Sequence, residues 1–172
     1  MKVSLHITAR TGKLHLIRKE LLTAENLLAP DHRGYTPLHA AAFSGELNLI
    51  PLDVLTKENL LLEDRCRKTP MHVAAIAGKL YQIPRYHLTL ETLLCGNPEI
   101  GRRALWGPDK IPTPLHEAVT NNHIDQLLGI DFGDNKLVKI IVGQGWWDKN
   151  KHVLSAKKGT TTNESNADIA LF

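Results

Sequence analysis

A repeat of 33 residues constrains this sequence more than any other feature. Shifted by that length, residues 3–35 align with residues 36–68 without a gap, and 14 of the 33 positions are identical. A further shift aligns residues 69–94 with residues 36–61 at 14 identities in 26 positions. The next Thr-Pro-Leu-His begins only at Thr113, so 11 extra residues precede it. Such a period predicts similar supersecondary units stacked in a row.

The best preserved part of the repeat reads as a short helix with start and stop signals. At residues 36–45 the text is T-P-L-H-A-A-A-F-S-G. The hydroxyl of Thr36 can cap the helix, and Pro37 suits the first helical position, where a missing N–H costs nothing. Gly45 can end the helix in a left-handed conformation. Leucine and alanines between them give a narrow apolar face that lets neighbouring helices approach closely.

This text occurs three times in register, at residues 36–45, 69–78 and 113–122, with a degenerate V-S-L-H at residues 3–6. It resembles the T-P-L-H-x-A-A-x-x-G signature of the ankyrin repeat, over about residues 3–128. The resemblance implies an all-α solenoid of helix-turn-helix units with finger loops, at residues 3–35, 36–68, 69–112 (with the insertion) and 113–128 (partial). We expect residues 129–158 to form a C-terminal cap and residues 159–172 a flexible tail.

The second half of each repeat departs from the usual ankyrin text. An outer helix is expected to begin at residues 47–50, with Pro51 and Pro84 near its fifth residue, where the free N–H groups of a first turn tolerate proline. Leu-Thr-x-Glu-Asn-Leu-Leu then replaces the usual loop. Thr56 as a cap and Glu58 in the first turn predict a short extra helical turn pinned to the core by Leu60 and its neighbour.

Composition agrees with one globular chain. The sequence is 42% hydrophobic and 23% charged, with a net charge of +3, which excludes a disordered chain. It holds no apolar run long enough to span a membrane and no signal peptide, so we expect a cytoplasmic protein, with a secreted effector as the alternative. The two cysteines, Cys66 and Cys95, are interpreted as reduced thiols.

No pattern of catalytic or metal-binding residues is present. His6, His39, His72 and His116 share one slot of the repeat, where the resemblance implies that each imidazole bridges backbone groups of adjacent fingers; no metal and no cofactor is expected. Asp31 and Asp64 also repeat with the period, which is typical of turn residues. Glycine-rich phosphate loops and nucleophile motifs are missing from the sequence. We therefore predict that the chain is not an enzyme.

The resemblance implies where a partner protein binds: on the fingers just before each Thr-Pro and on the last residues of each inner helix. Carried over by position, these residues are Arg10, Thr11, His32, Arg33, Tyr35, Phe43, Ser44, Arg65, Cys66, Lys68, Ile76, Ala77, Lys110, Thr120 and Asn121. The insertion adds Arg102, Arg103 and Trp106, since loops on a rigid scaffold frequently bind. Tyr35, Phe43 and Ile76 are apolar in slots expected to be exposed; packing between helices is the alternative for the last two.

Basic residues gather on the fingers, at Arg33, Arg65, Arg67, Lys68 and in the insertion, whereas acids such as Glu25 and Glu58 fall on the back. This arrangement favours an acidic partner protein over a solvated edge without a partner. The predicted function is a monomeric, non-enzymatic protein-binding module. The alternatives are a targeting module of a larger enzyme or effector, and a nucleic-acid-binding accessory protein, which would bind phosphates through the finger arginines.

Overall fold

The computed structural model describes residues 4–94, 112–127 and the single positions 130, 138, 143, 145, 147 and 148. Within these residues the chain is all-helical, without a β-strand. The α-helices are α1 (Leu5–Arg10), α2 (Ala24–Leu27), α3 (Pro37–Ser44), α4 (Lys57–Leu60), α5 (Pro70–Ile76), α6 (Leu90–Leu93) and α7 (Pro114–Thr120). Across the same residues, no helix has the length and apolar character needed to cross a membrane.

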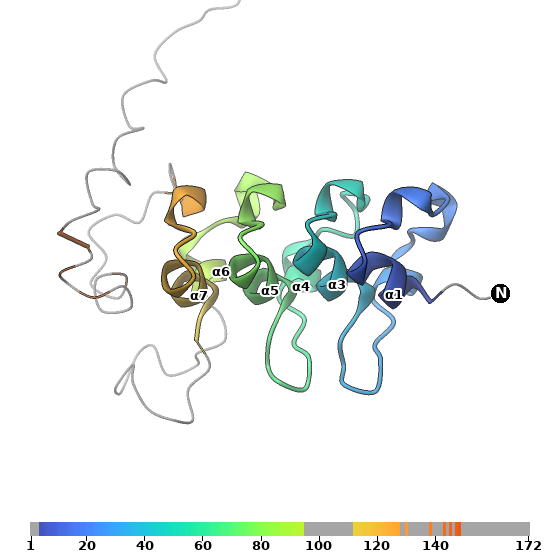
Figure 1. The fold of residues 1–172 in the computed structure, drawn as a ribbon, viewed down its shortest axis with the longest axis horizontal. Helices are drawn as coiled ribbons and strands as arrows, with labels where there is room; N and C mark the ends of the chain where they lie inside the picture. The colour runs from blue at the N-terminus through green and yellow to red at the C-terminus, as the bar shows by residue number, and fades with distance from the viewer. Residues whose placement is uncertain are drawn as a thin grey trace, which may run out of the picture.

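The longer helices stand side by side in one row. Helix α1 packs against α3, α3 against α5, and α5 against α7 (Figure 1). Short 3₁₀ turns lie along one edge of this row, and two loops extend from the opposite edge, before α3 and before α5 (Figure 1). We refer to α1, α3, α5 and α7 as the inner helices, and number the sequence repeats that contain them 1 to 4.

Helices α3 and α5 begin and end as the sequence predicts. Thr36 caps α3 by accepting a hydrogen bond from the N–H of His39, whose imidazole in turn accepts from the Thr36 N–H. Pro37 occupies the first helical position. Gly45 ends the helix in the left-handed region, with φ 81° and ψ 41°. The same reciprocal cap recurs in α5 between Thr69 and His72, so local residue types fix both ends.

The expected outer helix is wrong. Residues 47–49 form a single 3₁₀ turn, and Ile50 then takes an extended conformation, with φ −80° and ψ 135°. Ile83 does the same before Pro84, at φ −78° and ψ 132°. A residue that precedes proline is disfavoured in the α region, so both prolines end the helical turn instead of being tolerated inside it. Repeat 1 has the same break at Ile17 although Arg18 follows it, so the packing of the repeat also imposes it.

The extra helical turn is confirmed. Thr56 caps α4 by accepting from the N–H of Asn59, and the Asn59 amide donates to the Val54 carbonyl at 2.9 Å. Leu60 is fully buried and fixes this turn to the core. Thr23 and Asn26 repeat the arrangement around α2.

The core runs along the row of inner helices. Small side chains such as Ala41, Ala42 and Ala74 are fully buried between them, which allows the close approach expected from the sequence. Three positions beyond residue 128 join this core, since Ile130, Val138 and Trp147 are all buried. The proposed boundaries of the C-terminal cap and the tail otherwise fall outside the described residues.

Candidate functional site

The two loops before α3 and α5 are held by aspartates. We call the turns at residues 31–35 and 64–68 the first and second fingers. In the first, one carboxylate oxygen of Asp31 accepts from the N–H groups of Arg33 and Tyr35, at 2.8 and 3.0 Å. In the second, Asp64 accepts from Cys66 and Lys68 at 2.8 and 2.9 Å. Both aspartates are therefore the turn residues that the sequence predicts, and one oxygen of each carboxylate is bonded to the backbone of its own turn.

The fingers are also bonded to each other. The N–H of Arg65 donates to the carbonyl of Arg33 at 2.9 Å, so the two arginines leave adjacent stretches of backbone. Both side chains are exposed, as is His32 beside them. This bond fixes the spacing from which two guanidinium groups reach into solvent.

The histidines that share one position of the repeat have a structural role. Nε2 of His6 contacts the Tyr35 carbonyl at 3.0 Å, and Nε2 of His39 contacts the Lys68 carbonyl at 3.1 Å. Nδ1 of His39 is bonded to its own helix cap at Thr36. Each imidazole thus ties an inner helix to the next finger. Burial lowers the pKa of His39, which keeps the ring neutral.

His72 is the exception in this series. Its Nε2 is fully buried and has no hydrogen bond. By position its partner is the carbonyl of Pro112, directly after the insertion, which raises the pKa of His72 without reaching hydrogen-bond geometry. Burial outweighs this contribution and lowers the pKa to about 4. The imidazole of His72 therefore lacks the bond by which His39 holds the next finger.

The remaining predicted residues form two rows across the inner helices. Because the inner helices stand side by side in one row, residues at equivalent positions of the repeat line up across them. One row is Arg10, Phe43, Ile76 and Thr120, and the next is Thr11, Ser44, Ala77 and Asn121. The side chain of Phe43 is 51% exposed, whereas Ile76, Ser44 and Ala77 are half-buried. Phe43 is the open apolar residue of the rows.

Two of the predicted contact residues are partly engaged inside the chain. Tyr35 is half-buried against the core, and its ring lies 4.9 Å from that of His39, so it is not the open apolar anchor expected from the sequence. Burial accordingly raises the pKa of its phenol to about 12. Lys68 forms an ion pair with Glu117 at 3.1 Å. Acids therefore accompany the basic second finger, where Glu63 also lies 3.6 Å from Arg67.

We define the finger face as the exposed residues of the fingers and of the two rows: Arg10, Thr11, His32, Arg33, Phe43, Arg65, Cys66, Arg67, Thr120 and Asn121. Arg102, Arg103, Trp106 and Lys110 lie outside the described residues. Within the described ranges, no group of histidine, cysteine and acidic residues could hold a metal ion. The exposed Cys66 is a free thiol.

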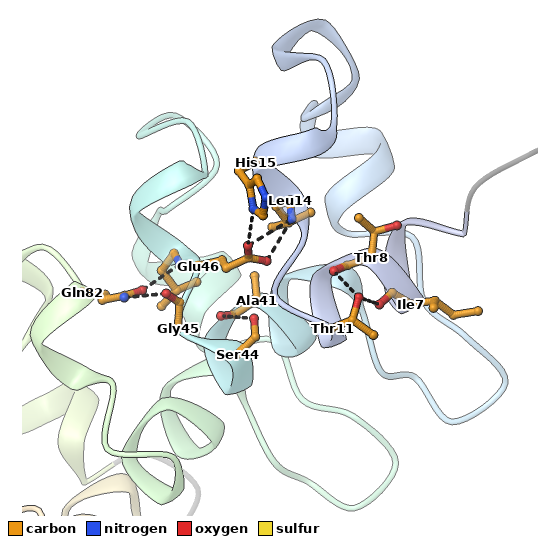
Figure 2. A network of polar contacts seen from close by, with 11 residues as sticks. Ile7, Thr8, Thr11, Leu14, His15, Ala41, Ser44, Gly45, Glu46 and Gln82 are labelled. Carbon is orange, nitrogen blue, oxygen red and sulfur yellow. Dashed lines mark hydrogen bonds and ion pairs between the residues drawn. The ribbon is translucent and has the colours of Figure 1, made fainter.

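Sequence reasoning missed a set of side chains that bridge the repeats. Figure 2 shows the buried carboxylate of Glu46 against the N–H of Leu14, at 3.0 and 3.1 Å, with His15 beside it at 3.7 Å. Gln82 likewise accepts from the N–H of Leu47 at 2.9 Å and donates to the Gly45 carbonyl. We call these side chains latches.

Gln126 repeats this latch between repeats 3 and 4. It accepts from Leu80 and donates to Gly78, both at 2.7 Å. The sequence signal for the latches was weak, because they occupy two different positions of the repeat. Glu46 directly follows Gly45, whereas Gln82 lies four residues after Gly78 and Gln126 four residues after Asn122. Each latch satisfies an N–H that a 3₁₀ turn leaves open.

Comparison with models of known protein families gives no match, and comparison with curated proteins gives none either.

Proposed function

We propose that this chain is a divergent ankyrin-type repeat protein that acts as a non-enzymatic protein-binding module. Three features support the family: the capped Thr-Pro-Leu-His helix, the imidazole bond from helix to finger, and the left-handed glycine after the helix. The 3₁₀ turns in place of an outer helix mark it as divergent. The helix cap, the imidazole bond and the left-handed glycine all belong to the inner helix and its finger. The opposite edge, which carries the 3₁₀ turns, can therefore vary without moving the finger face.

The observation that carries the binding proposal is the bond between the fingers. Arg33 and Arg65 are exposed and held in register by one backbone hydrogen bond, while the carboxylates of Asp31 and Asp64 are turned to their own backbones. Two guanidinium groups that leave the backbone at a fixed spacing suit carboxylates of a partner. Little backbone conformational entropy is lost on binding, because the turns are already ordered.

Phe43 adds an apolar contact at the other end of α3. It lies in the last turn of the helix, seven residues after the cap, which places it roughly 10 Å along the helix axis from the finger. Exposed aromatic and arginine side chains are the residue types that dominate binding energy at interfaces. The proposed partner is therefore an acidic protein segment that also offers an apolar side chain.

The test is affinity capture with the full chain from lysate of the source cells. One variant carries Arg33→Glu and Phe43→Ala on the finger face. A matched control carries Lys19→Glu and Tyr86→Ala, which change an exposed cation and an exposed aromatic residue elsewhere. Circular dichroism first establishes that both variants are folded. We expect a protein that the native chain and the control retain and the finger-face variant loses.

Two other results decide against the proposal. Capture of the same proteins by all three chains would remove the finger face from binding. Loss of the captured material after nuclease treatment, with affinity falling steeply as salt rises, would assign the arginines to nucleic acid. If the captured protein is an enzyme whose location depends on this chain, the result favours the targeting role.

A further inference from the structure

The first repeat leaves one side of its inner helix uncovered. Ile7 is 65% exposed, whereas the residues in the same slot of the next two repeats, Ala40 and Val73, are 1% and 6% exposed. Leu21 is 43% exposed where Val54 is 1% exposed. Because α1 packs against α3 on its other side, the slot of Ile7 is the one that a preceding inner helix covers in later repeats.

A second slot points in the same direction. This slot is the residue directly after the repeat glycine (after Asn122 in repeat 4), and its side chain lies against the preceding repeat. Glu46 bonds to Leu14, and the Lys79 side chain lies 3.0 Å from the place that a Cβ on Gly45 would occupy. The ring of His123 crowds Gly78 in the same way. In repeat 1 this slot is Lys13, which is exposed. Its ammonium group therefore belongs to the uncovered end.

A third slot completes the surface. Gln82 and Gln126 reach back to the preceding repeat as latches. The equivalent residue of repeat 1 is Leu16, which is 68% exposed. Figure 2 shows Ile7 on the side of α1 away from Glu46. We call Ile7, Lys13, Leu16 and Leu21 the end face.

The composition of the end face decides among occupants. A preceding repeat of the same kind would present an open N–H, and neither Lys13 nor Leu16 has an oxygen that could accept it. A second copy, related by a two-fold axis, would bring the lysines of two end faces together. Lys13 lies on the end face, and the exposed residues between Leu16 and Leu21 include Arg18 and Lys19 against one acid, Glu20, so this face attracts negative charge.

We propose that the end face, formed by Ile7, Lys13, Leu16 and Leu21, docks an acidic amphipathic α-helix of another protein. The occupant is a helix because an inner helix covers the equivalent face at each of the junctions α1–α3 and α3–α5. Three exposed apolar side chains match the apolar stripe of one such helix, and carboxylates along its border complement the cations. This surface is distinct from the finger face, and neither proposal depends on the other.

The probe is a synthetic peptide of about 18 residues, with leucines spaced three and four apart and glutamates between them. A second peptide has lysine in place of every glutamate. Fluorescence anisotropy follows the binding of each peptide to the full chain. The variants are Ile7→Asp, Leu16→Asp and Lys13→Glu. Leu52→Asp is the matched control, because Leu52 is 69% exposed in repeat 2, and Arg33→Glu tests the finger face.

We expect the acidic peptide to bind the native chain, and Ile7→Asp and Leu16→Asp each to weaken binding at least tenfold, about 1.4 kcal/mol. Lys13→Glu weakens the acidic peptide and favours the lysine peptide. Leu52→Asp leaves binding unchanged, and Ile7→Asp weakens binding by the same factor when Arg33→Glu is also present, with circular dichroism showing that every variant is folded.

Equal binding by the native chain and Ile7→Asp overturns the proposal, as does preference for the lysine peptide. A concentration-dependent dimer that Ile7→Asp abolishes would assign the end face to a second copy. Flotation with phosphatidylserine vesicles that Ile7→Asp abolishes, without binding of the acidic peptide, would assign it to a membrane surface. Both of these results also overturn the proposal.

Discussion

The carboxylate of Glu46 accepts the backbone N–H of Leu14 across the boundary between repeats 1 and 2, through oxygens at 3.0 and 3.1 Å. The side chain is buried, so water cannot replace it as the acceptor. This one contact therefore satisfies an open N–H of repeat 1 with an atom of repeat 2. It couples the stability of the terminal repeat to its neighbour.

We expect Glu46→Ala to lower the free energy of unfolding by about 2 kcal/mol, since a buried N–H loses a charged acceptor. Glu46→Gln should lower it by only about 1 kcal/mol, because the amide oxygen can accept as Gln82 does but is a weaker acceptor than a carboxylate. Urea unfolding at pH 7, followed by circular dichroism, measures both. Asp53→Ala removes an exposed acid as the control. If Glu46→Ala and Asp53→Ala are equally stable, the contact contributes nothing.

Gln126→Glu makes the opposite exchange, an amide to a carboxylate, in the latch between repeats 3 and 4. Gln126 accepts from Leu80 and donates to the Gly78 carbonyl, both at 2.7 Å. A carboxylate cannot donate and would set its charge against that carbonyl, so we expect a loss of about 2 kcal/mol relative to the native chain at pH 7. At pH 4 the protonated carboxyl can donate again, and the deficit should shrink. A deficit that is the same at both pH values would show that the donated bond is unimportant.

The sequence was sufficient to predict the inner helices because their signals are local. Thr36, Pro37 and Gly45 each act within one turn of their own position, and the structure has all three in the expected roles. The outer segment was predicted wrongly, because a proline tolerated in the first turn of a helix also excludes the α conformation from the residue before it. Ile50 is extended before Pro51, and Ile17 is extended before Arg18, so the packing of the repeat acts together with the proline.

The candidate site was predicted in part. Exposure of Arg33, Arg65 and Phe43 agrees with the slots from which they were chosen. The partial burial of Tyr35 was not predictable from its slot, because it depends on the packing of its ring against His39. The latches were missed for a related reason: they join residues of neighbouring repeats from two different positions, so the 33-residue period does not mark them.

Stability should fall as the pH decreases from 7 to 5, because of the buried histidines. Burial lowers the pKa of His72 from 6.5 to about 4. Below pH 6.5 the His72 imidazole takes up a proton in the unfolded chain but stays neutral in the folded chain. The contribution of His72 to the free energy of unfolding is therefore fully present above pH 6.5 and is lost as the pH falls toward 4. His72 alone accounts for about 2 kcal/mol between pH 7 and pH 5. His39 acts in the same direction.

His72→Gln isolates this effect, because glutamine can keep the reciprocal cap with Thr69 and does not titrate. Urea unfolding at pH 7 and pH 5 should show a smaller loss for His72→Gln than for the native chain. His32→Gln removes an exposed histidine and should leave the pH dependence unchanged. Identical pH dependence in all three chains would contradict a role for His72.

The second finger holds an arginine where the first holds a glycine. Gly34 and Arg67 both follow their aspartate by three residues, donate to its carbonyl at 2.9 Å, and have positive φ of 73° and 58°. For a residue with a Cβ, the left-handed conformation costs about 1–2 kcal/mol. The ion pair of Arg67 with Glu63 is exposed and offsets little of this cost.

Arg67→Gly should therefore raise the free energy of unfolding by about 0.5 kcal/mol, after the added freedom of glycine in the unfolded chain is subtracted. Gly34→Ala should lower it by about 1 kcal/mol, because its Cβ adds strain at positive φ and lies 3.3 Å from the Arg65 nitrogen. Arg65→Gly, at an ordinary φ in the same finger, should be slightly destabilising. Urea unfolding of the three variants measures these signs. A loss for Arg67→Gly as large as that for Arg65→Gly would show that the left-handed arginine is unstrained.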